Sequence, residues 1–168
     1  MGDVIEVVDW YNHAPVVRFC YRRSQVLNAA GEKTNQEQIE EAIERFAVKT
    51  GIRLAGYCVQ EEMRGKVPGY LCYMECCQEE GLSNAYGRSG VLAEEVLDEC
   101  LSCANYQYRS RRTLGLIRSP RISYLQEGSF RRYESYLAAR GIPRGQGKRV
   151  CVLDTADKKL FFASEQSV

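Results

Sequence analysis

The stretch KTNQEQIEEAIERFAVKTG, residues 33–51, contains the clearest helix in this sequence. Thr34 and Glu37 have the spacing of a capping box, and Gly51 supplies a stop at the C-terminal end. Apolar residues recur in the stretch at helical spacing, so we expect one face of the helix to pack against a sheet. These residues are Ile39, Ala42, Ile43, Phe46 and Ala47.

Strand-forming runs lie on both sides of this helix. VIEVVDWY (4–11) and VVRFCYRR (16–23) are rich in β-branched and aromatic residues, and the turn NHAP between them predicts a hairpin. SQVLNAA (24–30) is predicted to continue the same sheet. After the helix, IRLAGYCVQEE (52–62) and GYLCYMECC (69–77) are predicted to form a second strand pair.

Two further helices and a strand are predicted in the second half of the chain. One helix spans Val91 to about Tyr108, and Ser129 caps another over FRRYESYLAARG (130–141). PRISYLQ (120–126) is a strand candidate between them. The buried side of the first of these helices consists of Leu92, Val96, Leu97, Cys100, Leu101 and Ala104.

The order of these elements predicts the fold class. Helices and strands alternate irregularly and hairpins dominate, which indicates an α+β fold rather than a doubly wound parallel sheet. We expect a mixed, mainly antiparallel sheet flanked by about three helices, in a single compact domain over residues 1–168. KRVCVL (148–153) and the short segment DTADKKLFFASE (154–165) complete it.

Length and composition are those of an ordinary soluble globular protein. The chain has 168 residues, of which 45% are hydrophobic and 27% charged, and its formal net charge is +1. A net charge this small provides no strong field for nucleic acid or an acidic membrane surface. No apolar run approaches the roughly 18 residues of a membrane helix, and the start MGDVIEVV has no signal-peptide pattern. We therefore expect a cytoplasmic protein that binds neither nucleic acid nor membrane.

The eight cysteines admit two interpretations. Without an export signal, a disulfide framework is not expected, because the cytosol keeps thiols reduced. Cys72 and Cys76, followed by Cys100 and Cys103, resemble two zinc-ligand pairs in spacing. However, the first pair lies in a predicted strand and the second in a predicted helix, rather than on the short turns that zinc ribbons use. Buried free thiols are the preferred interpretation, and no metal site is predicted.

Two residues near the ends of the chain are candidates for ligand binding. Asp3 follows glycine at the start of a strand, where it is either a turn carboxylate or a carboxylate that accepts hydrogen bonds from a ribose diol. Lys148 follows the turn RGQG, and a lysine on such a turn either solvates a loop or reaches a phosphate. The sequence GQGK is not a P-loop, since it lacks the four-residue spacer and the Ser/Thr after lysine.

Other chemistry-bearing patterns are weaker. The basic run YRSRRTLGLIRSPR (108–121) is interleaved with tyrosine as in nucleic-acid patches, but a solvated helix end fits the small net charge better. His13 is the only histidine and lies in the predicted hairpin turn. No Ser-His-Asp or Cys-His set can therefore be assembled, and the chain alone does not make a complete active site.

Taken together, the segments resemble the C-terminal domain of the Gretchen Hagen family of acyl-acid amido synthetases, which adenylate auxin, jasmonate or benzoates and conjugate them to amino acids. GDVIEVVDWYNHAPVVRFCYRRSQVLN is similar to the start of that domain, and EKTNQEQ to its Asp-Lys-Thr-x-Glu motif. VPGYLCYME resembles the family's Pro-Gly-x-Tyr strand, with one residue fewer between the glycine and the tyrosine. NYQYRSRRTLGLIRSP, EGSF and GQGK follow in the family's order, so the resemblance covers essentially the whole chain.

The resemblance implies roles for three residues. Asp3 matches the aspartate that holds the ribose of the adenylate, and Lys148 matches the lysine that reaches the phosphate or the acyl carboxylate during adenylation. Lys33, in EKTNQE, is a further candidate for cofactor binding near the hinge, although a solvated lysine at a helix start explains it equally well. ATP and Mg²⁺ are the implied cofactors, because a cation offsets the charge that accumulates at the α-phosphate.

The resemblance also implies what else the enzyme needs. The family's ATP loop and acyl-acid pocket belong to a large N-terminal domain, so the chain is expected to be a mobile C-terminal lid that is inactive alone. A carboxylic acid and an amino acid are the implied substrates, and the N-terminal adenylation domain is the implied partner. The alternative is a non-catalytic module that keeps the fold and binds a protein partner.

Overall fold

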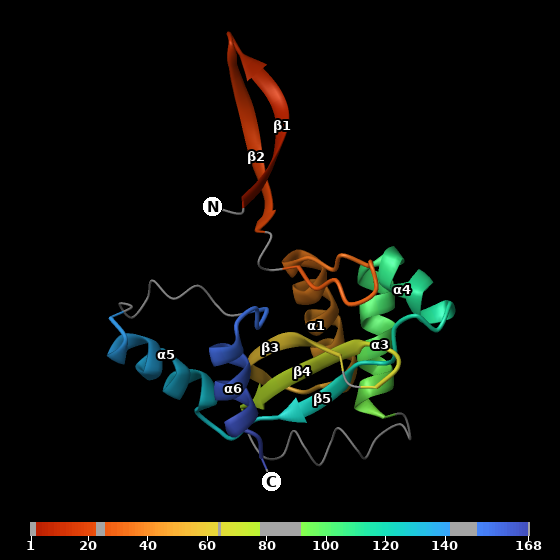
Figure 1. Ribbon diagram of the computed structural model, residues 1–168, viewed down its shortest axis with the longest axis vertical. Coiled ribbons are helices and arrows are strands. Elements are labelled where there is room, and N and C mark those ends of the chain that lie inside the picture. The colour runs from red at the N-terminus through yellow and green to blue at the C-terminus, as the bar shows by residue number, and fades with distance from the viewer. Residues whose placement is uncertain (1–2, 23–25, 64, 78–91, 142–150, 168) are drawn as a thin grey trace.

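A three-stranded mixed sheet lies at the centre of the molecule (Figure 1). The structure, a computed structural model, describes residues 3–22, 26–63, 65–77, 92–141 and 151–167. β3 (Leu54–Glu62) and β4 (Gly69–Cys76) are antiparallel, and β5 (Arg121–Tyr124) runs parallel to β4 on its other side. This confirms the α+β class and the mixed, mainly antiparallel sheet.

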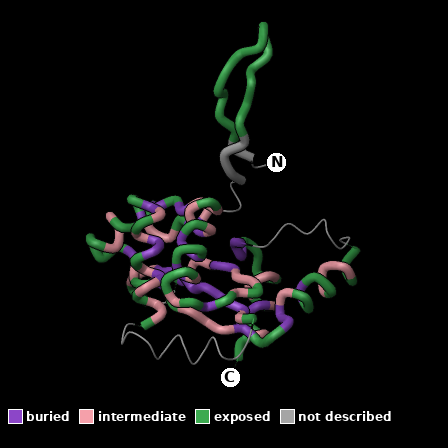
Figure 2. Tube along the Cα trace, turned by 180° about the vertical axis from the view of Figure 1, so that it is seen from behind, coloured by how far each residue is buried: buried purple, intermediate pink, exposed green. Residues whose placement is uncertain are grey.

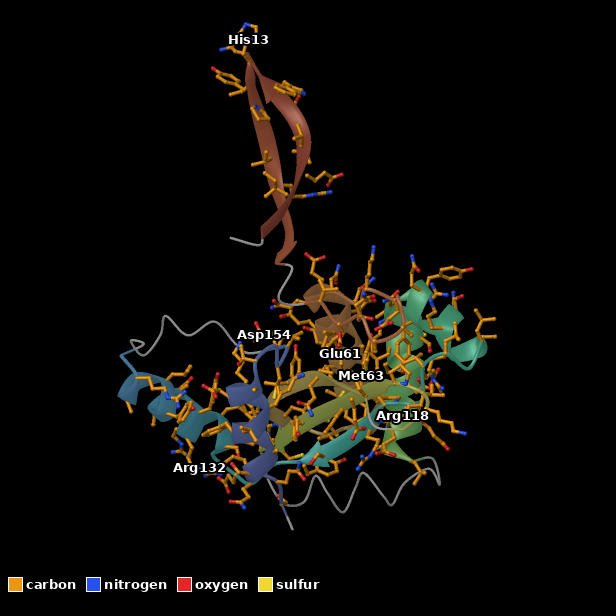
Figure 3. All side chains as sticks on the ribbon, in the orientation of Figure 1. His13, Glu61, Met63, Arg118, Arg132 and Asp154 are labelled. Carbon is orange, nitrogen blue, oxygen red and sulfur yellow. The ribbon has the colours of Figure 1, made fainter. Side chains whose placement is uncertain are left out.

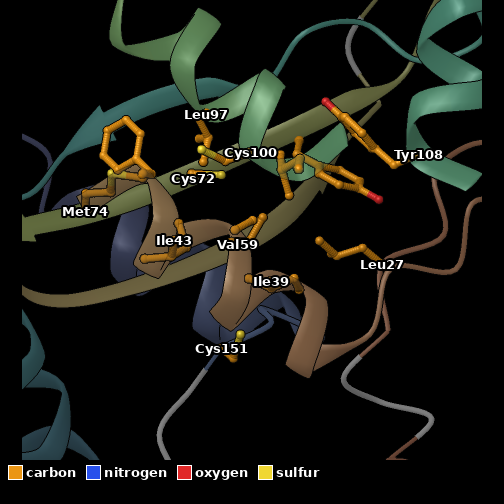
Figure 4. Packing of buried hydrophobic residues seen from close by; sticks show 14 of the residues in the cluster. Leu27, Ile39, Ile43, Val59, Cys72, Met74, Leu97, Cys100, Tyr108 and Cys151 are labelled. Atoms are coloured by element: carbon orange, nitrogen blue, oxygen red, sulfur yellow. The ribbon is translucent and has the colours of Figure 1, made fainter. Parts of the chain in front are cut away.

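The central strand β4 separates two hydrophobic clusters. Its side chains alternate, so Tyr70, Cys72 and Met74 belong to one cluster while Leu71 and Tyr73 belong to the other. The first cluster lies under α1 (Gln36–Thr50) and α3 (Ala93–Ala104), which pack against each other (Figure 4). The second lies under α5 (Ser129–Ala139) and α6 (Ala156–Ser164), so both faces of the sheet are covered.

The long helix α1 forms as predicted, but its cap lies one residue later than expected. Asn35 is the N-cap: its side chain accepts a hydrogen bond from the backbone N–H of Gln38 at 2.9 Å, and the Gln38 side chain accepts one from the backbone N–H of Asn35 at 3.0 Å. Thr34 and Glu37 therefore do not form the capping box. The reason is that Thr34 is fully buried and its hydroxyl is engaged by Tyr70 and Asn105.

The prediction of one continuous helix from Val91 to about Tyr108 is wrong, because the structure has two helices in this region. α3 ends at Ala104, and a separate helix α4 (Tyr106–Thr113) begins after Asn105, whose backbone is extended (φ −133°, ψ 109°). The Asn105 side chain accepts from the backbone N–H groups of Gln107 at 2.8 Å and Tyr108 at 3.3 Å, which caps α4. With α6 also helical, the described residues hold five helices rather than about three.

The start of α5 uses a cap that the sequence pattern did not indicate. Ser129 is the first helical residue, Gly128 is the N-cap, and no side chain of either accepts a capping hydrogen bond. Instead, the buried Glu75 on β4 accepts from the backbone N–H groups of Gly128 at 2.7 Å and Phe130 at 2.9 Å. A carboxylate at this position also complements the positive end of the helix dipole.

The N-terminal hairpin is separate from the central sheet. β1 (Asp3–Tyr11) and β2 (Ala14–Arg22) pair as predicted but form a two-stranded sheet of their own that projects from the body (Figures 1 and 2). Within residues 26–30, Leu27 makes only an isolated bridge to Thr34. The described part of SQVLNAA thus does not continue the hairpin sheet, and that prediction is wrong.

Candidate functional site

A tight loop follows the hairpin and carries Lys33. Its ends are joined by two backbone hydrogen bonds between Leu27 and Thr34, at 2.9 and 2.8 Å. Inside the loop, the Glu32 carboxylate is buried and accepts from the N–H groups of Ala29 at 2.8 Å and Ala30 at 2.7 Å. The loop is thus folded around a carboxylate that lies inside the protein.

A chain of four polar groups fixes this loop to the body. The Asn105 amide donates to the Thr34 hydroxyl at 2.8 Å, Thr34 lies 2.8 Å from the Tyr70 hydroxyl, and Tyr70 donates to Glu32 at 2.5 Å. The Tyr70 phenol has a single O–H, which donates the hydrogen bond to Glu32. The Thr34 hydroxyl is therefore the donor in its hydrogen bond with Tyr70. Burial, and then the negative charge of Glu32, raise the pKa of Tyr70 far above its ordinary value, so the phenol stays protonated.

Lys33 lies at the outer surface of this loop. Its backbone adopts a left-handed conformation (φ 49°), which is uncommon outside glycine, and its N–H donates to the Asn28 side chain at 3.3 Å. The side chain is exposed, and it forms no ion pair with any residue that the structure describes. The fixed loop therefore presents a cation to solvent on the side of the body from which the hairpin projects (Figure 1).

Arg111 lies against the same loop. A methyl group added at Gly31 would lie 3.5 Å from the guanidinium of Arg111. The Nε atom of Arg111 is buried and has no hydrogen-bond partner among the described atoms. Other arginines of the basic run are engaged: Arg112 binds Asp98 through Nε and Nη2 at 2.7–3.0 Å. Arg118 and Arg121 both pair with the buried Glu62. Arg111, from α4, therefore lies against Gly31 of the loop that carries Lys33.

A small cavity of about 230 Å³ opens beside the loop. Glu61, at the end of β3, lines it and accepts from the Asn28 N–H at 2.6 Å. Asp154 lines it too and pairs with Lys158 at 2.5 Å, whereas Lys159 forms no ion pair within the described residues. Figure 3 shows Glu61 and Asp154 on the hairpin side of the body. The rest of the lining is apolar and consists of Val26, Leu27, Val152 and Leu153.

A larger hollow of about 370 Å³ between α1 and α3 is less suited to a reaction. Its cations are already neutralised, because Arg45 pairs with Glu41 at 2.7 Å and Lys49 with Glu99 at 2.9 Å. Its cysteines are Cys100, which is buried, and Cys103, which is exposed. We therefore place the candidate site at the loop of residues 27–34 and the smaller cavity.

The structure describes the other predicted site residues only in part, and their roles stay predictions. Asp3 lies in β1 opposite Arg22 in the backbone register, and nothing further is described for its side chain. Lys148 lies outside the described residues. Three residues later in the sequence, the backbone carbonyl of Cys151 accepts a hydrogen bond from the Val59 N–H at 2.8 Å. The Leu153 N–H donates to the backbone carbonyl of Val59 at 2.9 Å. Residues 151–153 are therefore fixed to the edge of β3, next to the small cavity.

The cysteines and acidic residues do not form a metal site in the part of the chain that the structure describes. No three His, Cys, Asp or Glu residues are arranged there to hold a metal ion. Cys58, Cys72, Cys100 and Cys151 are buried free thiols. Burial raises the pKa of Cys151 to about 12, so this thiol is protonated and unreactive at neutral pH. Within the same residues, no helix has both the length and the apolar character of a membrane span.

The comparison with known protein families agrees with the observed fold. The family model described as "GH3 family C-terminal domain" matches residues 37–157, which is most of the chain. This chain belongs to the GH3 family. The prediction of a Gretchen Hagen C-terminal domain is thereby confirmed.

Individual GH3 proteins are similar over most of this chain but are much longer. A mouse (Mus musculus) "GH3 domain-containing protein" is 34% identical over 148 residues, covering 83% of this chain and 26% of that protein. The Arabidopsis thaliana "4-substituted benzoates-glutamate ligase GH3.12" is 26% identical over 180 residues, covering 97% of this chain and 31% of the ligase. The chain thus spans between a quarter and a third of these relatives.

Solved GH3 structures share the fold. The structure titled "GH3.15 acyl acid amido synthetase" aligns with a TM-score of 0.70 and 18% identity, covering 100% of this chain and 31% of that one. A second, titled as the same synthetase in complex with 2,4-DB, gives a TM-score of 0.68 over 99% of this chain. At this level of identity the likeness establishes the α+β architecture alone.

Proposed function

We propose that this chain is the C-terminal lid domain of an ATP-dependent acyl acid amido synthetase. Such an enzyme would adenylate a carboxylic acid resembling auxin, jasmonate or a benzoate and conjugate it to an amino acid. The observation that carries the proposal is the match of residues 37–157 to the C-terminal domain of a family whose members include amido synthetases. The remaining machinery would come from an N-terminal domain, and this chain alone would be inactive.

The loop and the cavity suggest what the chain contributes. In the first step a carboxylate oxygen attacks the α-phosphorus of ATP and pyrophosphate leaves; in the second an amine attacks the acyl carbon and AMP leaves. Lys33 is exposed on a fixed loop and lacks an acidic partner among the described residues, which suits it to contact a phosphate. Asp3 and Lys148 are assigned to the ribose and the phosphate from the family resemblance alone.

Mg²⁺ fits this chain less well than ATP. The described residues include no cluster of carboxylates able to bind a divalent cation, and the carboxylates nearest the loop are already engaged. We therefore assign Mg²⁺ ligands to the nucleotide phosphates and the N-terminal domain, and no step of this chain depends on the metal. The proposed compartment is the cytoplasm, where the buried thiols stay reduced.

The test is ATP–pyrophosphate exchange with a panel of acyl acids. The chain is assayed alone and mixed with a GH3 N-terminal domain, and exchange should appear only in the mixture. Lys148→Ala should abolish the stimulated exchange. Lys33→Ala should reduce the exchange rate about tenfold, because losing one charged contact costs roughly 1.4 kcal/mol. Lys49→Ala is the matched control and should leave exchange unchanged, since Lys49, in the last turn of α1, pairs with Glu99 of α3.

A second candidate function is a non-catalytic module that binds a protein partner. It is favoured by the exposed apolar residues of the hairpin, among them Trp10 at 63% and Ile5 at 54%, which suit a binding surface. If the mixture gives no exchange although the chain is folded and bound to the N-terminal domain, this second function replaces the first.

A further inference from the structure

The hollow of about 370 Å³ between α1 and α3 is lined by two thiols of the same helix. Cys100 and Cys103 lie three residues apart near the C-terminal end of α3, so their side chains lie on the same side of the helix. Cys103 is exposed, whereas Cys100 is 1% exposed and belongs to the cluster between α1, α3 and β4 (Figure 4). An accessible thiol therefore lies next to a buried one.

These two thiols are free and lie close enough to influence each other. Burial raises the pKa of the Cys100 thiol, and a negative charge on Cys103 acts in the same direction. Thiol–disulfide exchange needs an accessible thiol with a second thiol beside it, and it does not need a free cation. The pair therefore suits this chemistry, although the cations of the hollow are already neutralised by Glu41 and Glu99.

The spacing of the two cysteines allows a disulfide only if the helix deforms. Residues three apart in an α-helix have Cα atoms about 5 Å apart, within the range of about 4.4–6.8 Å that disulfides span. Their Cβ atoms, however, are about 5–6 Å apart, and a disulfide needs about 3.5–4.5 Å. The bond thus requires the last turn of α3 to tighten. Strained disulfides of this kind are readily reduced and are typically regulatory.

The end of α3 is connected directly to the loop of residues 27–34. Asn105 follows the last residue of the helix, and its side chain is buried. The side-chain amide donates to the Thr34 hydroxyl at 2.8 Å and to the Glu32 carbonyl at 3.2 Å. Tightening the turn that contains Cys103 displaces Asn105, two residues later, from these acceptors. The loop, which presents the candidate phosphate ligand, then loses part of its attachment to the body.

We propose that Cys100 and Cys103 form a reversible redox site that exchanges with a small soluble disulfide such as oxidised glutathione, and that oxidation of this site loosens the loop of residues 27–34. This inference goes beyond the proposed function and does not rest on it. Cytosolic disulfides are usually transient and redox-sensing, which agrees with a strained bond that reduced thiols can open again.

The reaction has two steps that balance without a further reagent. The Cys103 thiolate attacks one sulfur of the small disulfide, which forms a mixed disulfide and releases one small thiol. The Cys100 sulfur then attacks the Cys103 sulfur, forms the intramolecular bond and releases the second small thiol. Two electrons pass from the protein to the small disulfide, and the two cysteine protons end on the released thiols. An excess of the reduced small thiol reverses both steps.

Mass spectrometry identifies the intramolecular bond directly. Trypsin cleaves after Arg88 and Arg109, so Cys100 and Cys103 fall in one peptide, residues 89–109. The chain is incubated in glutathione buffers of increasing oxidised fraction, and the remaining free thiols are alkylated. We expect both cysteines of this peptide to lose alkylation together without retaining glutathione, and to regain it after treatment with dithiothreitol.

Three variants separate the two thiols from other exposed cysteines. Cys103→Ala should abolish the reaction of the peptide, because the thiol that remains is buried. Cys100→Ala should leave glutathione attached to Cys103, because the second step is lost. Cys77→Ala is the matched control, since Cys77 is also exposed but lies outside this hollow, and it should leave the disulfide unchanged. Cys103 and Cys77 are both exposed, so their comparison stands even if Cys100→Ala does not fold.

Hydrogen exchange measured by NMR reports the effect on the loop. The N–H groups of Leu27 and Thr34 each donate to the backbone carbonyl of the other residue, so they exchange slowly while the loop is attached. Oxidation should speed their exchange roughly tenfold in the parent chain, the effect of losing about one hydrogen bond, and should leave it unchanged in Cys103→Ala. The amides of α5, which packs on the opposite face of the sheet, should be unaffected.

Any of three results would overturn the proposal. Cysteines of peptide 89–109 that remain fully alkylated under conditions that modify Cys77 would show that the hollow admits no small disulfide. A glutathione adduct that persists at Cys103 in the parent chain would show that Cys100 does not reach it. An intramolecular disulfide that forms without any change in the exchange of Leu27 and Thr34 would refute the connection through Asn105.

Discussion

The hairpin β1–β2 and the strand pair β3–β4 are built from the same kinds of residue but differ in their surroundings. Both are antiparallel pairs rich in β-branched and aromatic side chains. In β4, the residues from Gly69 to Glu75 are all buried, because helices cover both faces of the sheet. In the hairpin, the corresponding side chains are exposed. Local sequence therefore determines that a strand forms, while distant segments determine whether its side chains are buried.

The largest expected effect comes from removing a side chain of the covered core. Leu97 on α3 is 0% exposed and packs in the cluster above β4. Leu97→Ala should lower the free energy of unfolding by about 3 kcal/mol, since it removes buried apolar surface and leaves a cavity. Urea unfolding followed by far-ultraviolet circular dichroism measures the change. A loss below about 1 kcal/mol would mean that the core relaxes around the cavity.

A smaller loss of unfolding free energy is expected when the chain of polar groups that holds the loop of residues 27–34 is broken. Asn105→Ala removes the cap of α4 and the donor to Thr34, which should cost about 2 kcal/mol by the same measurement. Thr155→Ala is the control, because Thr155 also caps a helix, α6, but is exposed. Its cost should be about 1 kcal/mol. Equal losses would mean that Asn105 acts only as a cap.

The ion pair between Arg132 and Glu165 should make a small, pH-dependent contribution. The hydrogen bond from Arg132 holds the pKa of Glu165 below its usual value, and the Ser129 hydroxyl 2.9 Å away acts in the same direction. A carboxyl whose pKa is lowered by folding stabilises the protein above its unfolded pKa, and this stabilisation is lost as the pH falls through the lowered pKa. Glu165→Gln should cost about 0.5 kcal/mol at pH 7 and nothing at acid pH below both pKa values.

The smallest effect is expected in the hairpin. Trp10→Ala should change the unfolding free energy of the body by less than about 0.5 kcal/mol, because the ring is 63% exposed and contacts no core cluster. For the same reason, Trp10 fluorescence should change little through the unfolding transition that circular dichroism reports. A cooperative fluorescence transition that coincides with the circular dichroism curve would show that the hairpin is coupled to the body.

The strands and the main helix could be predicted from sequence because their patterns are local. The period of α1 and the alternation in the two hairpins depend on neighbouring residues alone. The break at Asn105 could not be predicted in this way, because the apolar stripe continues through it and the reason for the break is a contact with Thr34, 71 residues away in sequence. The one-residue shift of the α1 cap has the same cause.

The candidate site was less accessible to sequence reasoning than the fold. Lys33 was identified from a motif, but the buried Glu32 beside it was missed, since an acidic residue in a polar stretch predicts exposure. Glu75 was missed as a cap for α5, because it lies on a strand more than fifty residues away. Arg111 differs from Arg112 and Arg118 in lacking a carboxylate partner among the described residues, which no pattern reveals.

The alternation of β4 between two cores also constrains how this region can change in length. Deleting or inserting one residue within Tyr70–Met74 would turn the buried side chains on one side of the change into the opposite core. Length changes are therefore expected only at the ends of the strand. The residue that VPGY lacks relative to the family pattern falls between Gly69 and Tyr70, at the first position of β4, where its loss leaves both cores in place.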